Sequence, residues 1–384
     1  MFQNAWQIQP DRGFLINPDP LVRLTDSDAL KALVPGDALD HIAQISNDLP
    51  DLLQTRKVRS VLDALPVYDL SPIHELTDFH IIERLMQTYA YFASAFVYAT
   101  NEEPEHRIPA GVAQPLYQLS QMVERPPILT YASYVLTNWQ RTEANAGIEV
   151  DKLALVQNFL GVRDEQWFIL IHVDIEARAA AAIDGLKRAA AAADEHDTVK
   201  LETALRDMIA SIQLMLKTFD RMPEECNSDV YYFRVRPYIF GFTDVIYEGV
   251  EAYEGKSQSF RGQTGAQSSI IPAMVAGLGL KHETTGLTQH LDVMKHYMPK
   301  PHREFIAEMG QSCIREFVEA NATNRALADA YNECLLRVID FRKMHLHYAT
   351  TYIAQKVLNP VGTGGTIFMD WLSQLVQETE SQLV

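Results

Sequence analysis

Helical periodicity runs through most of the sequence, and this feature limits the possible folds more than any other. Segment 164–193, DEQWFILIHVDIEARAAAAIDGLKRAAAAA, opens with acidic residues that suit a helix N-terminus. It ends in an alanine-rich stretch that favours helix and close packing. Segment 198–222 repeats apolar residues at spacings of three and four, as an amphipathic helix does. Because no run alternates strictly between apolar and polar residues, the sequence predicts an all-α fold.

The remaining segments divide this predicted helical chain into two parts. Further helices are predicted over residues 27–58 with a break at Pro35, over 78–99 and over 126–140. Loops are predicted over 100–109, 254–269 and 359–366. Segment 141–151, RTEANAGIEVD, has the composition of a linker. We therefore expect a small N-terminal helical domain, residues 1–150, and a larger helical domain, residues 151–384.

Composition and charge narrow the class of protein. Apolar residues make up 47% of the chain and charged residues 22%, which is typical of a globular protein. The net charge of -17 argues against binding to nucleic acid or to an anionic membrane. No signal-peptide pattern opens the chain, and no apolar run is long enough to span a membrane, so we expect a cytoplasmic protein without a membrane segment.

Cysteine and histidine usage excludes several kinds of metal site. Cys226, Cys313 and Cys334 are widely spaced and form no CxxC motif, so we expect reduced structural thiols. The twelve histidines are dispersed and HExxH is absent. A haem would still fit this sequence, because the porphyrin supplies four nitrogens and the protein need add only one axial histidine.

Two histidines stand two residues apart in the segment VIDFRKMHLHYATTYI, residues 338–353. At about 100° per residue they point to nearly opposite sides of a helix, so they cannot share one metal ion. His347 aligns with polar residues, and we expect it to be solvated. His345 shares an apolar face with Phe341 and Tyr352. The pattern leaves two readings of His345, a hydrogen-bonded core residue or a ligand of a metal or haem.

Two more polar residues lie in apolar surroundings. His172 shares a helical face with Phe168 and Ile175, so it is either a core histidine bonded to Glu176 or a backbone carbonyl, or a residue facing the open side of a haem. Arg236 lies in the aromatic run YYFRVRPYIFGF, where a buried guanidinium needs an anion. That anion is either a structural carboxylate or the carboxylate of a small molecule.

Several of these motifs occur in an order that resembles one family. The stretches are RPPILTYASYVLTNW, YYFRVRPYIFGF, FRGQTGAQSS, MKHYMPKPHREF, FRKMHLHYATTYI and GTGGT. In this order they closely resemble indoleamine 2,3-dioxygenase. The likeness covers most of the chain. It implies two helical domains, with haem b in the larger one and the substrate pocket at their junction.

The resemblance implies a haem enzyme that inserts both atoms of O2 across the indole C2–C3 bond of L-tryptophan to give N-formylkynurenine. His345 falls on the proximal ligand of the iron, and Arg342 on an arginine near the haem propionates. Arg236 falls on the arginine that binds the substrate carboxylate, and Thr363 on a loop threonine that contacts the amino acid. The remaining matches are Tyr131 and Phe168 around the indole and Thr264 and Gly265 in the loop over the haem. Such an enzyme also needs a reductant to keep the iron ferrous.

The sequence departs from the family at the pocket. His172 stands where the mammalian enzyme has a serine, which is similar to the distal histidine that bonds the indole N–H in tryptophan 2,3-dioxygenase. Tyr231 replaces a substrate-contacting phenylalanine, GQTG replaces GGSA, and the loop before GTGGT is shorter. These changes alter pocket volume and polarity, so the substrate is the open question.

Three readings follow for the function. The first is tryptophan dioxygenation, with His172 orienting the indole N–H. The second keeps the scaffold and oxidises a different or substituted indole. The third is a non-catalytic haem sensor of O2, NO or redox state, against which Arg236 and Thr363 speak, because a gas sensor needs no amino-acid clamp.

Overall fold

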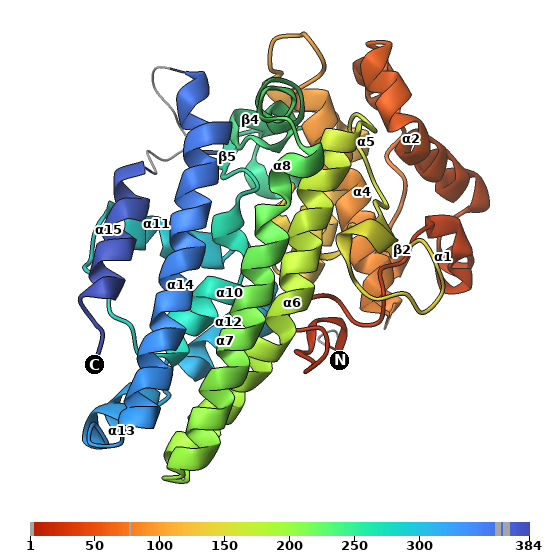
Figure 1. The fold of residues 1–384 in the computed structure, drawn as a ribbon. Coiled ribbons are helices and arrows are strands. Elements are labelled where there is room, and N and C mark those ends of the chain that lie inside the picture. Colours follow the sequence, from red (N-terminus) through yellow and green to blue (C-terminus); the bar gives the residue numbers. More distant parts are fainter. Residues whose placement is uncertain (1–3, 77, 358–361, 364–368) are drawn as a thin grey trace.

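The computed structural model describes residues 4–76, 78–357, 362–363 and 369–384. The chain folds mainly into helices (Figure 1), which confirms the all-α prediction. The helices are α1 (Asp28–Leu33), α2 (Gly36–Gln54), α3 (Val58–Asp63), α4 (Phe79–Val97), α5 (Ala110–Val123), α6 (Arg163–Asp194), α7 (Thr198–Asp220), α8 (Met222–Glu225), α9 (Ser228–Val230), α10 (Ile270–Gly277), α11 (Gly286–Lys295), α12 (Lys300–Met309), α13 (Ile314–Ala320), α14 (Arg325–Tyr352) and α15 (Met369–Glu380).

Three long helices form the framework that carries the site. Helix α7 packs against both α6 and α14, and the three run side by side in Figure 1. Gly185 allows α6 and α7 to approach closely, since a Cβ there would lie 2.8 Å from Met208. Helix α7 begins where the side chain of Asp197 accepts bonds from two backbone amides. The predicted helices 164–193 and 198–222 are thereby confirmed.

The N-terminal helices surround a buried one. Helix α4 is buried along almost its whole length and packs against α3 and α5, as the apolar run 78–99 predicted. The predicted break at Pro35 is also confirmed, because Pro35 is the N-cap of α2. Apolar residues on both sides of position 150 belong to one hydrophobic cluster. The proposed division into domains at that position stays a prediction.

The prediction of a helix over 126–140 is wrong for most of its length. Only Ala132–Leu136, the segment η4, forms a short π-helical turn. The side chain of Gln267 accepts a hydrogen bond from the backbone N–H of Tyr131, and the Trp139 indole N–H donates to the carbonyl of Leu136. Side-chain bonds of this kind satisfy backbone groups that a longer helix would have paired.

Short strands form where no sheet was predicted. They are β1 (Arg107–Ile108), β2 (Gln140–Arg141), β3 (Leu153–Ala154), β4 (Phe242–Tyr247) and β5 (Gln258–Phe260). β4 lies between β1, which is parallel to it, and β5, which is antiparallel, while β2 pairs with β3. Asp244 adopts a left-handed φ of 53° in the irregular part of β4. This irregularity breaks the alternation of buried and exposed residues, which explains why periodicity missed the strand.

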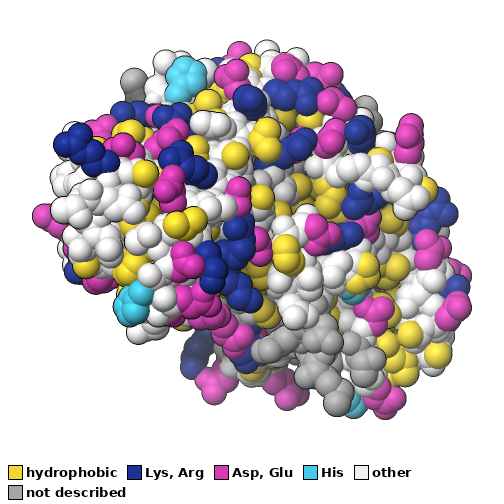
Figure 2. All heavy atoms as spheres, turned by 60° about the horizontal axis from the view of Figure 1, so that its bottom comes forward, with side chains coloured by type: hydrophobic (Ala, Val, Ile, Leu, Met, Phe, Trp, Pro, Cys, Tyr) yellow, Lys and Arg dark blue, Asp and Glu magenta, His cyan; other side chains and the backbone are white. Residues whose placement is uncertain are grey.

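One face of the molecule carries a mixture of charges. Figure 2 shows acidic and basic side chains interspersed over one face of the molecule. Among the helices that the structure describes, none is long and apolar enough to cross a membrane.

Candidate functional site

The two apolar-face histidines lie on two of the framework helices, His172 on α6 and His345 on α14. The side chain of His345 is exposed, yet desolvation by the surrounding protein is the main cause that lowers its pKa to about 4. A side chain that is exposed and still desolvated lies in a recess of the protein. The charge of His172 lowers the same pKa further, so the two imidazoles are close enough to interact. The two histidines therefore lie within electrostatic range of each other.

The neighbouring His347 behaves differently. It is exposed, as the helical spacing predicted, and its ring lies 5.5 Å from that of Tyr348. Within the described part of the chain, the ring of His345 forms no hydrogen bond. A neutral imidazole in an interior hollow is suited to bind a metal through a nitrogen lone pair.

His172 is held in one orientation. Its Nδ1 lies 2.7 Å from the carbonyl oxygen of Phe168, so the predicted backbone partner is the one observed rather than Glu176. Since a carbonyl only accepts, Nδ1 carries the hydrogen and Nε2 of the neutral ring is an acceptor. Burial lowers the pKa of His172, which favours this neutral form. The site thus presents a fixed hydrogen-bond acceptor near His345.

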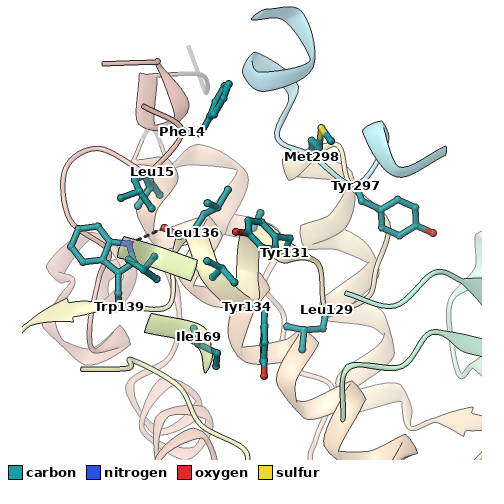
Figure 3. Close-up of a cluster of buried hydrophobic side chains, with 14 of the residues drawn as sticks. Phe14, Leu15, Leu129, Tyr131, Tyr134, Leu136, Trp139, Ile169, Tyr297 and Met298 are labelled. Carbon is teal, nitrogen blue, oxygen red and sulfur yellow. Dashed lines mark hydrogen bonds between the residues drawn. The ribbon is translucent and has the colours of Figure 1, made fainter. Parts of the chain in front are cut away.

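Aromatic side chains line the space beside His172, and these include the predicted Tyr131, Phe168 and Tyr231. The rings of Phe168 and Tyr231 stack at 4.3 Å, and Phe168 lies 4.6 Å from His172. Tyr131 meets the His172 ring edge-on at 6.3 Å. Figure 3 shows Tyr131 in the buried cluster that includes Leu129, Tyr134 and Leu136. The structure brings three sequence-predicted aromatic residues together, and a flat apolar ligand would suit them.

Phe219 of α7 also belongs to this wall, and sequence reasoning missed it. Its ring lies 6.4 Å from His172, 5.4 Å from Phe341 and 4.9 Å from Tyr348. It therefore bridges the helix of His172 and the helix of His345. Its place on the buried face of an amphipathic helix was visible in the sequence, but its partners were not.

Arg236 is buried at 2% exposure at the start of a short 3-10 helix, Arg236–Ile239. Its guanidinium carbon lies 5.1 Å from the ring centre of Tyr232 and 4.8 Å from that of Phe240. Burial lowers its pKa, while Tyr231 and Tyr232 oppose that shift. Tyr231, next to Phe168 in the aromatic wall, thus links this cation to the site.

The loop that holds the predicted Thr264 and Gly265 continues into Gln267, whose side chain bonds the backbone N–H of Tyr131. The Thr264 hydroxyl accepts from the backbone N–H of Ala266, and a Cβ at Gly265 would meet no atom within 4 Å. The Thr363 hydroxyl donates to the carbonyl of Gln263 at 2.5 Å, so the GTGGT threonine contacts this loop. Residues 364–366 of GTGGT lie outside the described residues.

Arg342 points toward the C-terminal helix. Its Nη1 donates to the Leu375 carbonyl at 2.9 Å and to the Thr379 hydroxyl, and its Nη2 lies 3.2 Å from Nε2 of His282. Burial lowers its pKa to about 10. The residue thereby fastens α14 to α15, and its predicted contact with a cofactor carboxylate stays a prediction.

Glu176 completes the described site. It lies one turn after His172, is 1% exposed, and accepts a hydrogen bond from the Tyr131 hydroxyl at 3.0 Å. The sequence had suggested Glu176 only as a partner of His172. Its actual partners come from other segments.

Comparison with known proteins agrees with the geometry. The sequence model of a family described as indoleamine 2,3-dioxygenase matches residues 3–359. Indoleamine 2,3-dioxygenase of Saccharomyces cerevisiae is 31% identical over 97% of this chain and 91% of its own length. Indoleamine 2,3-dioxygenase 1 of Mus musculus is 29% identical over 98% of this chain and 94% of its own. A fungal relative, indoleamine 2,3-dioxygenase nanC of Aspergillus nanangensis, is 26% identical over 98% of this chain.

Proposed function

This chain belongs to the indoleamine 2,3-dioxygenase family and is a dioxygenase, and from that premise we propose that it converts L-tryptophan to N-formylkynurenine with haem b held by His345. The observation that carries the proposal is the pair of neighbouring histidines joined by aromatic rings: Phe219 contacts both His172 and the rings of the helix that holds His345, and burial and the charge of His172 lower the pKa of His345 to about 4.

The residues present fit a haem. His345 is neutral, exposed and without a hydrogen bond among the described residues, so it would hold the iron of a bound haem through a ring nitrogen. The residues around His172 supply aromatic rings and one hydrogen-bond acceptor, Nε2 of His172. In this proposal, O2 and the indole bind on that side. When bound, haem supplies the iron that binds and activates O2.

The chain's own residues orient the substrate in this proposal. Arg236 binds the amino-acid carboxylate through two parallel hydrogen bonds, in a buried place where such a pair is strong. Phe168 and Tyr231 contact the indole faces, and Nε2 of His172 accepts the indole N–H. Fixing both ends of the substrate holds C2 and C3 in one place, and this converts binding energy into rate. Thr363 and Gly265 close the pocket against water.

A second candidate substrate is a substituted indole. His172 and the hydroxyl of Tyr231 make this pocket more polar than one lined by serine and phenylalanine. A ring substituent that hydrogen-bonds to either group would gain affinity here. Because Arg236 binds a carboxylate in this proposal, both tryptophan and the substituted indole would need to carry one.

The test is mass spectrometry of the product formed from L-tryptophan under labelled O2 by haem-loaded, reduced protein. We expect N-formylkynurenine with two labelled oxygens, and the His347→Ala variant to form the same product. One labelled oxygen would contradict dioxygenation. No product, together with normal O2 binding, would contradict tryptophan as substrate, and a panel of substituted tryptophans would then separate another indole from a gas sensor.

The proposal has two further parts, a reductant and a cellular location. The enzyme needs a reductant that keeps the iron ferrous, and we place it in the cytoplasm. A purified protein that turns over only when a reductant is added would support the first part. Imaging of the tagged full chain in its own cell tests the second.

A further inference from the structure

A buried polar cluster joins the C-terminal helix α15 to the helix of His345. Helix α15 packs along α14 (Figure 1). Arg342 of α14, at 6% exposure, donates from Nη1 to the carbonyl of Leu375 and the hydroxyl of Thr379, both on α15. Its Nη2 lies 3.2 Å from Nε2 of His282, which belongs to the loop between α10 and α11. Three segments of the chain therefore meet at one guanidinium.

The partners of His282 fix the position of its hydrogen. Because a guanidinium can only donate, Nε2 accepts from Arg342 and the hydrogen of the neutral ring lies on Nδ1. Nδ1 then donates to Oε2 of Glu378, on α15, at 2.5 Å. The other oxygen of Glu378 accepts from the side-chain amide of Gln374 at 2.6 Å. The hydrogen bonds of this Arg342–His282–Glu378 triad thus run in one direction, from the guanidinium to the carboxylate.

The triad also supplies a charge to a buried cation. The direct partners of the Arg342 guanidinium, a carbonyl, a hydroxyl and an imidazole, are uncharged. Burial lowers the pKa of Arg342 to about 10, and the charge of Glu378 opposes that shift. Neutral His282 lies between the two charges and hydrogen-bonds to both. Loss of His282 or Glu378 would therefore leave a desolvated guanidinium with a weaker set of partners.

A second contact holds the loop of His282 to the end of the chain. The backbone N–H of Lys281 donates to the side-chain oxygen of Gln382 at 2.8 Å, and the side-chain amide of Gln382 donates back to the Lys281 carbonyl at 2.7 Å. Arg315 of α13 donates to the Gln382 carbonyl at 3.0 Å. The residue before His282 is thereby fixed through its backbone, so the ring meets Arg342 and Glu378 from an anchored position.

Arg342 lies three residues before His345 on α14, about one helical turn. The ring of His345 forms no hydrogen bond within the described part of the chain, so its position depends on the backbone of its own helix. One side of α14 packs against α7, and the triad holds another side against α15. Groups that fix Arg342 therefore fix the turn that carries the proposed iron ligand.

We propose that His282 and Glu378 are positioning residues of the proposed haem site, which act through Arg342 on the turn of α14 that carries His345. Docking of the C-terminal helix is then a condition of firm haem binding. This inference rests on the proposed function for the presence of haem. Neither residue has to touch the haem, since both act on the protein that holds it.

Three variants and a matched control test the triad. His282→Gln keeps a neutral group that can donate and accept, whereas His282→Leu can do neither. Glu378→Gln keeps a hydrogen-bond acceptor and removes the charge. Glu380→Gln is the control, because it removes an ion pair with Lys343 that joins the same two helices at 2.7 Å but has side chains 55% and 45% exposed. Exposed pairs of this kind contribute little.

The first measurement is the rate at which each haem-loaded protein releases haem to a haem-scavenging protein. His282→Leu should release it about tenfold faster or more, as loss of a group that orients a metal ligand does. We expect Glu380→Gln and His282→Gln to stay within about twofold of wild type, and Glu378→Gln to lie between. Equal rates for His282→Leu and Glu380→Gln would overturn the proposal. Circular dichroism checks that each variant is folded.

The second measurement is the iron–histidine stretching band in the resonance Raman spectrum of the ferrous protein. It reports only folded, haem-bound molecules, so a variant that is merely less stable leaves the band in place. We expect the band to shift in His282→Leu and to keep its wild-type position in His282→Gln and Glu380→Gln. An unmoved band in His282→Leu would mean that α15 supports the fold without positioning His345, and this would overturn the inference.

The third measurement uses the full chain and needs no haem. Protonation of His282 would place an N–H on Nε2 against the N–H groups of Arg342, so docking of α15 should weaken in acid. Arg342 of α14 and Glu378 of α15 are the charged groups that act on this ring. Burial, with Arg342, lowers the pKa of His282 from 6.5 against the effect of Glu378. Stability from the neutral ring is therefore present above pH 6.5 and is lost as the pH falls below it.

Hydrogen exchange of the α15 amides measures this loss. After correction for the intrinsic exchange rate, protection should fall by up to about tenfold between about pH 7.5 and 5.5 in wild type, and hardly at all in His282→Gln. In His282→Leu the protection should be low at both pH values. Equal losses in wild type and His282→Gln would overturn the triad as the contact that docks α15.

These readouts separate this inference from the proposed function. A protein whose haem release and Raman band depend on His282, but which forms no N-formylkynurenine, would contradict the proposed reaction and leave the role of His282 intact. A protein that forms N-formylkynurenine while His282→Leu releases haem as slowly as wild type would contradict the positioning role alone.

Discussion

The two walls of the site hold their histidines in opposite ways. On α6, His172 is fixed by the Phe168 carbonyl at 2.7 Å and by the rings of Tyr131, Phe168 and Phe219. On α14, His345 forms no hydrogen bond within the described part of the chain, although its own helix is fastened to α15 through Arg342. The α6 wall is organised by protein contacts, whereas His345 keeps its nitrogens for another partner. An orienting group needs to be fixed, while a metal ligand needs a lone pair that the protein does not use.

The largest effect should come from the α14 wall. We expect His345→Ala to abolish stable haem binding and turnover, because the proposed axial ligand is lost. Soret absorbance after reconstitution with haem measures this. His347→Ala is the control on the same helix, since His347 is exposed, and it should keep both. A His345→Ala protein that retains haem and full activity would show that the α14 wall does not hold the iron.

The next effect concerns Arg236, which belongs to neither helix. We expect Arg236→Ala to raise KM for tryptophan about a hundredfold, as loss of a buried charge partner does, while the Soret band is kept. Arg236→Lys should recover part of the affinity, because an ammonium cannot make the two parallel bonds of a guanidinium. An unchanged KM in the alanine variant would contradict the proposal that Arg236 binds the substrate carboxylate.

A third prediction concerns His302, a buried histidine of helix α12. His302 is buried against Trp6 and Phe14 and contacts the hydroxyl of Ser269, and burial, with Arg125, lowers its pKa to about 3. Its unfolded value is 6.5, so stability from the neutral ring is present above that pH and is lost as pH falls through the range from 6.5 to 3.

Between pH 7 and 5 the free energy of unfolding should therefore fall by about 2 kcal/mol more in wild type than in His302→Gln. Denaturant titration of both proteins at the two pH values measures the difference. Parallel losses in the two proteins would mean that this histidine is not desolvated.

The smallest effect should come from His172. We expect His172→Ser to lower kcat about tenfold, because the indole keeps its aromatic contacts and loses one oriented acceptor. The comparison substrate is 1-methyltryptophan, which has no indole N–H. Wild type and His172→Ser should differ little with it. An equal loss on both substrates would show that the fixed ring on α6 acts in another way than accepting that hydrogen.

Much of the fold could be predicted because helical periodicity is a local signal. The boundaries of α4, α6 and α7 follow from apolar spacing and from residues such as Asp197 that start helices. The segment around Tyr131 could not be predicted, since a side chain from residue 267 takes its backbone N–H. Strand β4 was hidden because the left-handed Asp244 interrupts its alternation.

The sequence by itself determined the helical class, the opposite faces of His345 and His347, the buried arginine and the ordered motifs of the family. The first three depend on residues that are neighbours in the chain, and the family motifs depend on their order along it. Only the tertiary structure decided that Tyr131, Glu176 and Ser268 share one oxygen, because they lie 45 and 92 residues apart. It also decided that Arg342 bonds to α15 and that Phe219 joins the two walls. Burial creates these partnerships by removing water as the alternative partner, and no spacing along the chain records which groups will meet.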